Sequence, residues 1–251
     1  QNSLDHSLAA YDRLYIFYEK SVWMQSIIDH CMRRYPEKTV IINPIATKNK
    51  DYPYWANARF DGAKPFVENL EMFCREILNL EFFSKSNGII ATKNLKHRKY
   101  IKRIIIHPTS SRDGKNWPKE KYIQVMQKLL KKGLDPKIIV HGSEREEWKE
   151  YLEFCPEFTS LSELSAYVYE SGVMIGNDSG IGHLASCLGI PTVTICRSKM
   201  ASLFWRPSWS EGIVLYPSSI VPNIKGLRWR DKYWKSFVFV PQVLAAVNKL
   251  I

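Results

Sequence analysis

The sequence lacks any hydrophobic run near the ~20 residues that a membrane-spanning helix needs, so it predicts no integral membrane protein. It also lacks an Asp-x-Asp motif and any Cys-x-x-Cys pair. The stretch QNSLDHSLAA at the start has no basic and apolar signal-peptide layout. We therefore expect a cytoplasmic protein with reduced thiols, no metal and no disulfide framework. Its scattered cysteines are Cys31, Cys74, Cys155, Cys187 and Cys196.

Positive charge is in excess. The 251 residues carry a formal net charge of +11, with 45% hydrophobic residues, which is ordinary for a soluble globular protein. This charge predicts attraction to polyanions, whether nucleic acid, nucleotide phosphates or an anionic membrane face, and does not choose among them. The length allows one large domain or two modest ones.

Residues 1–100 predict a short α/β segment. Apolar runs at 13–18 and 38–43 favour strands, and amphipathic spacing at 21–35 and 66–80 favours helices, the first capped by Ser21. The loop between the expected strand at 38–43 and the expected helix at 66–80 contains Tyr52, Tyr54, Trp55 and Phe60, which could face a sugar acceptor or pack in the core. A linker with a charge run is expected at 84–100. Because this is less than a full lobe and starts at Gln1 instead of Met, we expect a partial amino-terminal lobe.

Residues 101–251 predict a doubly wound parallel sheet, since apolar strands alternate with helices. Strands are expected at 102–108, 136–142, 172–176 and 192–196. Helices are expected at 119–133, ending at Gly133, and at 144–155, 162–170 and 182–189.

Polar loops follow three of these strands, at the edge where such sheets bind ligands. The first, at 107–118, holds Ser110, Ser111 and Lys115, which suit a phosphate or a merely solvated loop. The second, at 141–148, contains Glu144, Glu146 and Glu147, which suit helix capping or a ribose.

The third loop, Gly-Asn-Asp-Ser-Gly at 176–180, can cap a helix whose amides point at an anion. His183 could donate to a phosphate oxygen or be a buried core histidine. A dinucleotide fingerprint, Gly180-x-Gly182-x-x-Ala185, is a weaker alternative because it follows two earlier strand–helix units. Three such loops together predict a nucleotide site.

Two segments carry a family resemblance. GNDSGIGHLASCLGIPTV (176–193) and HPTSSRDGKNWPKEKY (107–122) resemble the signatures of the lipopolysaccharide heptosyltransferases, ADP-heptose-using glycosyltransferases of the GT-B type. The segment at 107–122 is most similar to the heptosyltransferase I version of its signature. The resemblance covers about residues 101–200. It implies two Rossmann-type lobes, with an acceptor-side lobe in 1–100 and a nucleotide-sugar lobe with a basic aromatic tail in 101–251.

The resemblance also implies a function and a set of donor-binding residues. The function is transfer of a sugar, heptose in this family, from a nucleotide-sugar such as ADP-heptose to a lipopolysaccharide core or related glycan, with no cofactor. A catalytically inactive sugar-nucleotide or glycan binding protein is the alternative. The matching donor-binding positions are Ser110, Ser111, Lys115, Glu146, Asp178, Ser179, Gly180 and His183.

Two departures from the family pattern stand out. The family's amino-terminal Gly-Asp, whose aspartate is the usual catalytic base, is not found in residues 1–100, so the base is unassigned and Asp178 is a candidate. After the strand at 192–196 the family continues Tyr-Gly-Pro-Thr, where this chain has Arg197-Ser-Lys199-Met.

The tail at 223–239 interleaves basic and aromatic residues, which is typical of nucleic-acid or anionic membrane surfaces and equally of a solvated loop whose aromatics pack on the core. Given the resemblance, an anionic glycolipid acceptor or peripheral contact with the inner membrane face is the better expectation. A nucleic-acid module would instead bind DNA or RNA with steep salt dependence.

Overall fold

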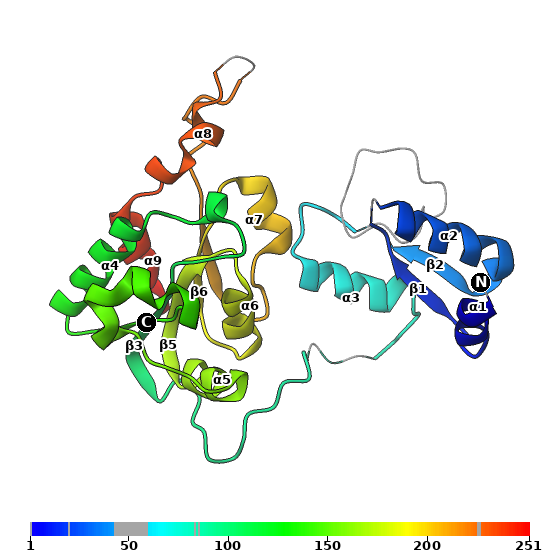
Figure 1. The fold of residues 1–251 in the computed structure, drawn as a ribbon, viewed down its shortest axis with the longest axis horizontal. Coiled ribbons are helices and arrows are strands. Elements are labelled where there is room, and N and C mark those ends of the chain that lie inside the picture. Colours follow the sequence, from blue (N-terminus) through cyan, green and yellow to red (C-terminus); the bar gives the residue numbers. More distant parts are fainter. Residues whose placement is uncertain (1, 20, 43–59, 83, 85, 225–226) are drawn as a thin grey trace. The chain divides into compact units, whose positions relative to one another are not determined.

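The computed structural model describes residues 2–19, 21–42, 60–82, 84, 86–224 and 227–251. The chain forms two units, Gln1–Ser84 and Lys85–Ile251 (Figure 1). The expected aromatic residues Tyr52, Tyr54 and Trp55 lie outside the described residues. Phe60 is buried and its ring meets those of Phe66 and Phe73 edge-on, so its place is in the core.

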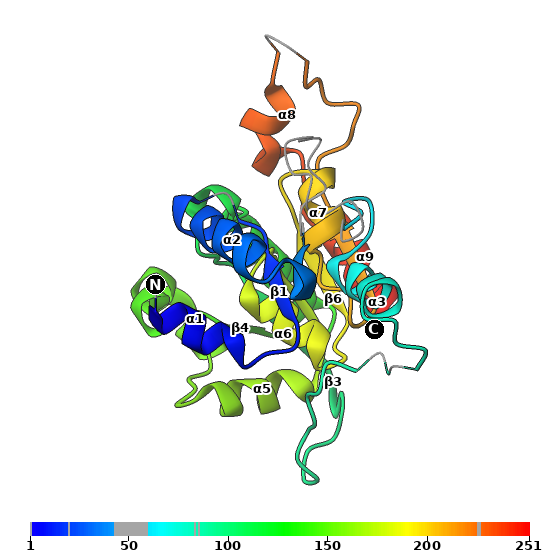
Figure 2. The ribbon, with the colours of Figure 1, turned by 90° about the vertical axis from the view of Figure 1, so that its right-hand side faces the viewer.

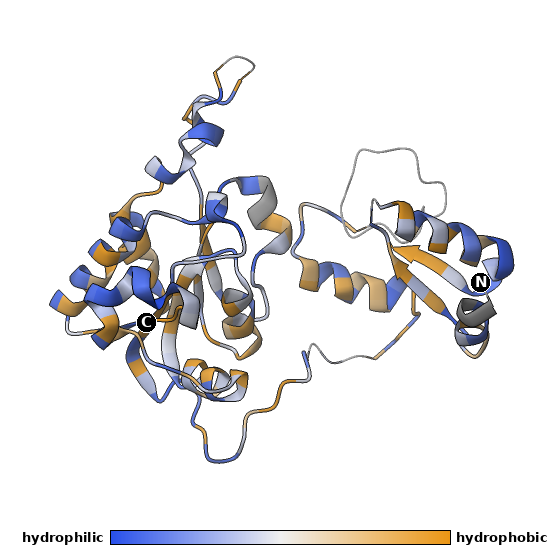
Figure 3. Cartoon of the chain, in the orientation of Figure 1, coloured by the Kyte–Doolittle hydropathy of each residue, from blue (hydrophilic) through white to orange (hydrophobic). Residues whose placement is uncertain are grey.

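The first unit is built on two parallel strands in the described residues, paired from Leu14 with Thr39 to Phe17 with Ile42. Ser21 caps the helix between them as expected, its Oγ accepting the Met24 N–H at 3.2 Å. The strands are largely hydrophobic, whereas much of this helix is hydrophilic (Figure 3). The elements are α1 (Asn2–Ala9), β1 (Leu14–Phe17), α2 (Val22–Arg34), the 3-10 turn η1 (Pro36–Lys38), β2 (Thr39–Ile42) and α3 (Phe66–Glu76).

The second unit contains a five-stranded parallel sheet of order β4-β3-β5-β6-β7 in its described residues. Its strands are β3 (Tyr100–His107), β4 (Asp135–Ile138), β5 (Ser171–Asn177), β6 (Thr192–Ile195) and β7 (Gly212–Leu215). The helices and 3-10 segments are η3 (Asp113–Lys115), α4 (Lys119–Lys131), η4 (Gly142–Phe154), α5 (Leu161–Tyr169), α6 (Gly180–Cys187), α7 (Lys199–Trp205), α8 (Trp229–Lys232), η5 (Trp234–Ser236) and α9 (Val240–Leu250).

The alternation of side chains along the strands supplies two cores. Ile104 and Ile106 of β3 are fully buried with Val243 and its neighbours from α4 and α9, on one face of the sheet. Ile105 lies on the other face with residues of α5 and α6. Figure 1 shows these helix pairs on opposite sides of the strands. Because both faces are covered, the strands read as continuous apolar runs in the sequence.

The expected linker at 84–100 belongs mostly to the second unit, so the division lies at 84/85 and not at 100/101. The backbone N–H groups of Arg98 and Tyr100 bond to the carbonyls of Tyr169 and Glu170 at 3.0 and 2.8 Å. Asn87 Nδ2 donates to the Cys187 carbonyl at 2.6 Å. These bonds join the segment to α5, β5 and α6.

Two expected helices differ in form. The α-helix predicted at 144–155 is instead the 3-10 segment η4, which leaves helical geometry at Trp148 and Tyr151. That bend lets the Trp148 indole reach the core, where it is 2% exposed. The helix from Phe66 ends at Glu76, because Asn79 adopts a left-handed φ of 53° shortly afterwards. Gly133, at φ 72°, terminates α4 as predicted.

Candidate functional site

Strand β3 lies between β4 and β5, so the chain reverses its direction of sheet growth there. Ligands bind at such switch points, outside the carboxyl ends of the strands. The loop after β3 and the turn after β5 meet at this place. The site predicted from the sequence therefore coincides with the position that sheet topology favours.

Buried Asn177 joins the two segments. Its Oδ1 accepts from the Trp117 N–H at 2.9 Å and from the Tyr122 hydroxyl at 3.0 Å. Its Nδ2 donates to the Pro108 carbonyl at 2.6 Å. Asn177 is 1% exposed, so each of these groups would otherwise lie unpaired in the interior. The asparagine thus fixes the loop at both ends and does not cap α6.

The loop after β3 presents its polar groups in different ways. The Ser110 hydroxyl is held within the loop, donating to Asn116 Oδ1 at 2.7 Å. Ser111 is exposed and lines a cavity with Ser110. Lys115, in η3, reaches across to Asp178 with its Nζ 3.0 Å from Oδ2. The side chain of this lysine is 45% exposed, so an incoming anion has access to it.

Asp178 lies between two basic side chains. Besides Lys115, the Nε2 of His183 is 3.7 Å from its Oδ1. Hydrogen bonding to His183, then to Lys115, holds the pKa of the Asp178 carboxyl below its usual range, although burial acts in the opposite direction. A carboxylate with a lowered pKa is a weak proton acceptor near neutral pH. Its evident role is to orient Lys115 and His183.

The start of α6 offers unused donors. Ser179 occupies the N-cap position, yet its side chain makes no capping bond. Its Oγ is buried and has no hydrogen-bond partner among the described residues, which is rare for a polar atom in a native protein. The first N–H groups of a helix attract anions, and Gly180 is open to space where a Cβ would be. The turn is therefore prepared for an oxyanion.

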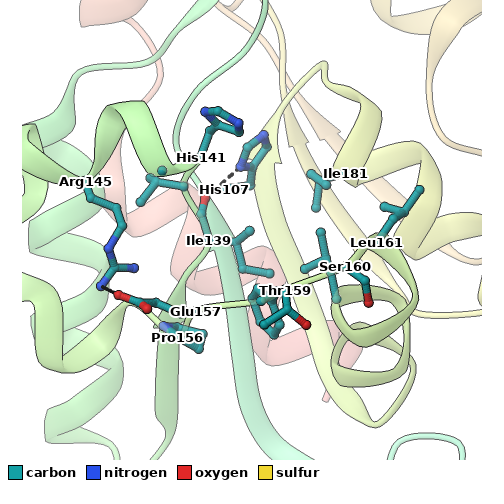
Figure 4. Close-up of a pocket in the computed structure, with 14 residues that line it drawn as sticks. His107, Ile139, His141, Arg145, Pro156, Glu157, Thr159, Ser160, Leu161 and Ile181 are labelled. Atoms are coloured by element: carbon teal, nitrogen blue, oxygen red, sulfur yellow. Dashed lines mark hydrogen bonds and ion pairs between the residues drawn. The ribbon is translucent and has the colours of Figure 1, made fainter.

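Two adjoining cavities follow the sheet edge. One of about 570 Å³ is lined by Ser110, Ser111, Glu144, Asp178, Ser179 and Gly180, among others. The other, of about 670 Å³, is lined by apolar side chains such as Ile139 together with the paired Arg145 and Glu157 (Figure 4). His107, His141, Leu161 and Ile181 line both. The two cavities thus share a wall of four residues, as an extended ligand site requires.

Of the glutamates in the loop at 141–148, Glu144 lines one of these cavities, and the structure leaves Glu146 outside both. The Glu146 side chain is 82% exposed and pairs with Lys149 at 3.0 Å. Glu144 Oε2 accepts from the His141 N–H at 2.8 Å and from the Thr109 hydroxyl at 3.2 Å. Glu144 and Glu146 are two residues apart in the sequence, yet the structure places them differently relative to the cavities.

His107, at the end of β3, is a cavity residue that the sequence did not single out. Its Nδ1–H donates to the Ile139 carbonyl at 2.8 Å, linking β3 to β4. Burial holds the pKa of the imidazole below its ordinary value of 6.5. The ring is therefore neutral at pH 7, and its other nitrogen is free of a proton.

This lowered pKa makes stability depend on pH. Above pH 6.5 the His107 ring is neutral in both the folded and the unfolded state. Below pH 6.5 the unfolded chain binds a proton at this ring more readily than the folded chain does, so the free energy of unfolding falls. We expect His107→Asn, which retains a donor toward Ile139, to reduce this loss between about pH 6.5 and 5. Urea unfolding of both proteins, followed by tryptophan fluorescence at several pH values, measures it. Identical pH dependence in the variant would contradict the role of this histidine.

The family model of glycosyltransferase family 9 (heptosyltransferase) matches residues 61–216, which is more than half of the chain and contains the entire site described above. The chain belongs to glycosyltransferase family 9. This membership confirms the resemblance found in the two loop signatures. The chain is 29% identical over 163 residues to lipopolysaccharide heptosyltransferase 1 of Campylobacter coli. The match covers 59% of this chain and 47% of that protein.

A second relative, lipopolysaccharide heptosyltransferase 3 of Escherichia coli K12, is 24% identical over 161 residues, or 59% of this chain and 46% of that protein. The chain thus spans about half the length of the curated relatives it matches. The solved structure of E. coli heptosyltransferase WaaC with ADP superposes with a TM-score of 0.61 at 14% identity, covering all of this chain and 77% of that chain. This likeness confirms the predicted α/β class with parallel sheets and a GT-B-like fold.

In the parts of the chain that the structure describes, no helix has the length and apolarity to cross a bilayer. Within the same residues, no group of three or more His, Cys, Asp or Glu side chains is arranged to hold a metal ion.

Proposed function

We propose that this family 9 protein transfers a sugar from a nucleotide-sugar donor to a glycan acceptor, with ADP-heptose as the donor and a lipopolysaccharide core as the acceptor. The observation that carries the proposal is one cavity lined by Ser111 and the uncapped start of α6, with Lys115 paired to Asp178 in its wall. Such groups suit a diphosphate. The named relatives are heptosyltransferases, which supports the same chemistry.

The adjoining cavity of about 670 Å³, which is lined by Ile139 (Figure 4) and Phe158, is the proposed seat of the adenine ring. Glu144 lines the cavity of about 570 Å³ and bonds to the backbone of His141, a residue of the shared wall, which suits a hydrogen bond from a ribose hydroxyl. We therefore propose Glu144 in the role that the sequence gave to Glu146. The other expected donor-binding residues remain proposed contacts of the diphosphate and the sugar. They are Ser110, Ser111, Lys115, Asp178, Ser179, Gly180 and His183.

In the proposed reaction the acceptor hydroxyl oxygen attacks the anomeric carbon, and the bond from that carbon to the diphosphate breaks. The acceptor proton passes to a base. Lys115 would shift from Asp178 to the departing diphosphate, and the α6 amides would stabilise the same developing charge. No cofactor enters this scheme. Because Asp178 is held ionised between Lys115 and His183, another group is expected to take the proton.

The test incubates the chain with ADP-heptose, with and without lipopolysaccharide core oligosaccharide, and measures ADP release. Acceptor-dependent release is expected. ADP binding without any release would overturn the transferase proposal in favour of the sugar-nucleotide binding alternative. Failure to bind ADP at all would overturn the donor site itself.

We further propose that the excursion formed by residues 217–224 and 227–233 contacts an anionic membrane face. It extends away from the sheet in both views (Figures 1 and 2). Its side chains include Ile220, Ile224 and Trp229, which are 90%, 68% and 52% exposed. Arg228 and Lys232 lie among them. Exposed apolar and aromatic groups beside basic ones are typical of interfacial binding.

Ile220→Ser with Ile224→Ser is expected to reduce sedimentation with vesicles containing phosphatidylglycerol several-fold, because both side chains lose apolar contact with the lipid. The matched control is Ile89→Ser with Ile90→Ser, whose side chains are 48% and 90% exposed elsewhere in the same unit. Equal sedimentation of the two double variants would contradict this surface assignment.

A further inference from the structure

Two histidines line both the smaller cavity, of about 570 Å³, and the larger one, of about 670 Å³, at the wall that the cavities share. His107 ends β3, and His141 follows shortly after Ile139, whose backbone N–H bonds to the Ile106 carbonyl at 2.8 Å. Figure 4 shows both imidazole rings at the same end of the larger cavity. The two rings therefore face a ligand that extends from one cavity into the other.

The hydrogen bonds of the two rings fix them in opposite tautomers. A carbonyl can only accept, so the bond of 2.8 Å between His107 Nδ1 and the Ile139 carbonyl places the proton on Nδ1 and leaves a lone pair on Nε2. His141 Nδ1 instead accepts from the Ser143 backbone N–H at 3.3 Å. In the neutral His141 ring the proton is therefore on Nε2. One histidine offers the cavity an acceptor and the other offers a donor.

The other polar side chains of the larger cavity are engaged with neighbouring residues. Arg145 pairs with Glu157 at 2.9 Å. The Thr159 hydroxyl donates to Glu163 Oε2 at 2.9 Å, and Ser160 Oγ accepts from the Glu163 N–H at 3.1 Å. Among the described residues, Nε2 of neither histidine has a hydrogen-bond partner. These two nitrogens therefore remain for a ligand.

An acceptor beside a donor matches one edge of adenine. This edge presents the N6 amino group, which donates, next to N7, which accepts, whereas guanine presents O6 and N7, which both accept. In the anti conformation that is usual for purine nucleotides, this edge lies on the side of the base toward the 5′-phosphates. A nucleotide with its diphosphate in the smaller cavity and its base in the larger one therefore turns this edge toward the shared wall.

We propose that His107 and His141 make the donor site selective for adenine, with the N6 amino group donating to His107 Nε2 and His141 Nε2–H donating to N7. This assignment rests on the proposed function. Guanine and hypoxanthine carry an oxygen at position 6, whose lone pairs would face the lone pair of His107. The His107 ring offers a proton at Nε2 only by giving up its bond to the Ile139 carbonyl.

The experiment is isothermal calorimetry of the full chain with ADP and four analogues. These are GDP, inosine diphosphate, 7-deaza-ADP and the diphosphate of purine riboside, which lacks the 6-amino group. GDP and inosine diphosphate are expected to bind at least about tenfold more weakly than ADP, because a hydrogen bond is replaced by repulsion between two acceptors. The other two analogues each lose one hydrogen bond and are expected to bind about threefold to tenfold more weakly.

Two variants assign each loss of affinity to its histidine. In His141→Phe, ADP and 7-deaza-ADP are expected to bind equally, because the donor to N7 is gone. In His107→Asn, whose shorter side chain withdraws from the base, ADP and the purine riboside diphosphate are expected to bind equally. The matched control is His97→Phe, which removes an exposed imidazole that lines neither cavity and is expected to keep every wild-type preference.

Equal binding of ADP and GDP to the wild type, or analogue losses that persist in both cavity variants, would overturn the proposal and leave the donor site in place. A variant that weakens every ligand by the same factor would show that its histidine only supports the fold, which overturns its assignment. If no nucleoside diphosphate binds, the proposed donor site falls and this proposal falls with it. Where a variant fails to fold, the analogue series in the wild type still decides whether this edge of adenine is read.

Discussion

Lys115→Ala is expected to weaken ADP binding by about tenfold to a hundredfold, because one charged hydrogen bond to a phosphate contributes about 1.5–3 kcal/mol. The lysine extends from η3 to Asp178 in the cavity wall, with its Nζ 3.0 Å from that carboxylate and nearly half its side chain exposed. Isothermal calorimetry of the full chain with ADP measures the change. The effect on folding should be small, since exposed ion pairs contribute little to stability.

Lys131→Ala is the control for this measurement. Lys131 is also exposed and basic, and it lies in the last turn of α4, away from the cavity residues. It should bind ADP as the wild type does. If Lys115→Ala binds equally well, the diphosphate does not lie beside η3, and the proposed donor orientation is wrong. A loss of affinity in both variants would point to general charge attraction instead.

Asn177→Ala is expected to have the largest effect on stability, lowering the free energy of unfolding by about 2–5 kcal/mol. The substitution leaves the buried Trp117 N–H and Tyr122 hydroxyl without the acceptor that both use, and the Pro108 carbonyl without its donor. Urea unfolding followed by tryptophan fluorescence measures the loss, because Trp117 and Trp148 are buried in this unit. ADP affinity should fall as well, since Asn177 anchors the loop that carries Lys115.

The matched control is Asn248→Ala, which removes an exposed asparagine of α9 whose Oδ1 accepts only from Lys132, at 3.1 Å, among the described residues. We expect it to change stability by less than about 0.5 kcal/mol. Similar losses of unfolding free energy in the two asparagine variants would show that the hydrogen bonds of Asn177 do not stabilise the loop after β3. A loss confined to stability, with ADP affinity intact, would separate folding from donor binding.

The pattern of apolar runs and helix-end residues in the sequence predicted most helices and strands of the second unit, because these depend on residues that are close together along the chain. The strand at 102–108 was recognisable from consecutive isoleucines, which are buried on both faces of a parallel sheet. Ser21 and Gly133 marked helix ends through the backbone geometry that their side chains permit. The segment 144–155 was predicted less well, because burial of Trp148 overrode helical spacing there.

The sequence by itself determined the family, the α/β class and the two loops that face the proposed donor, since these reside in short motifs and periodic apolar runs. Only the tertiary structure decided which side chains meet. It set Lys115 against Asp178, made Asn177 a buried link between two loops, and placed Glu144 at the cavity and Glu146 outside it. It also brought His107 and His141 together in the wall that two cavities share. Such contacts join residues that are distant along the chain, and local propensity carries no information about them.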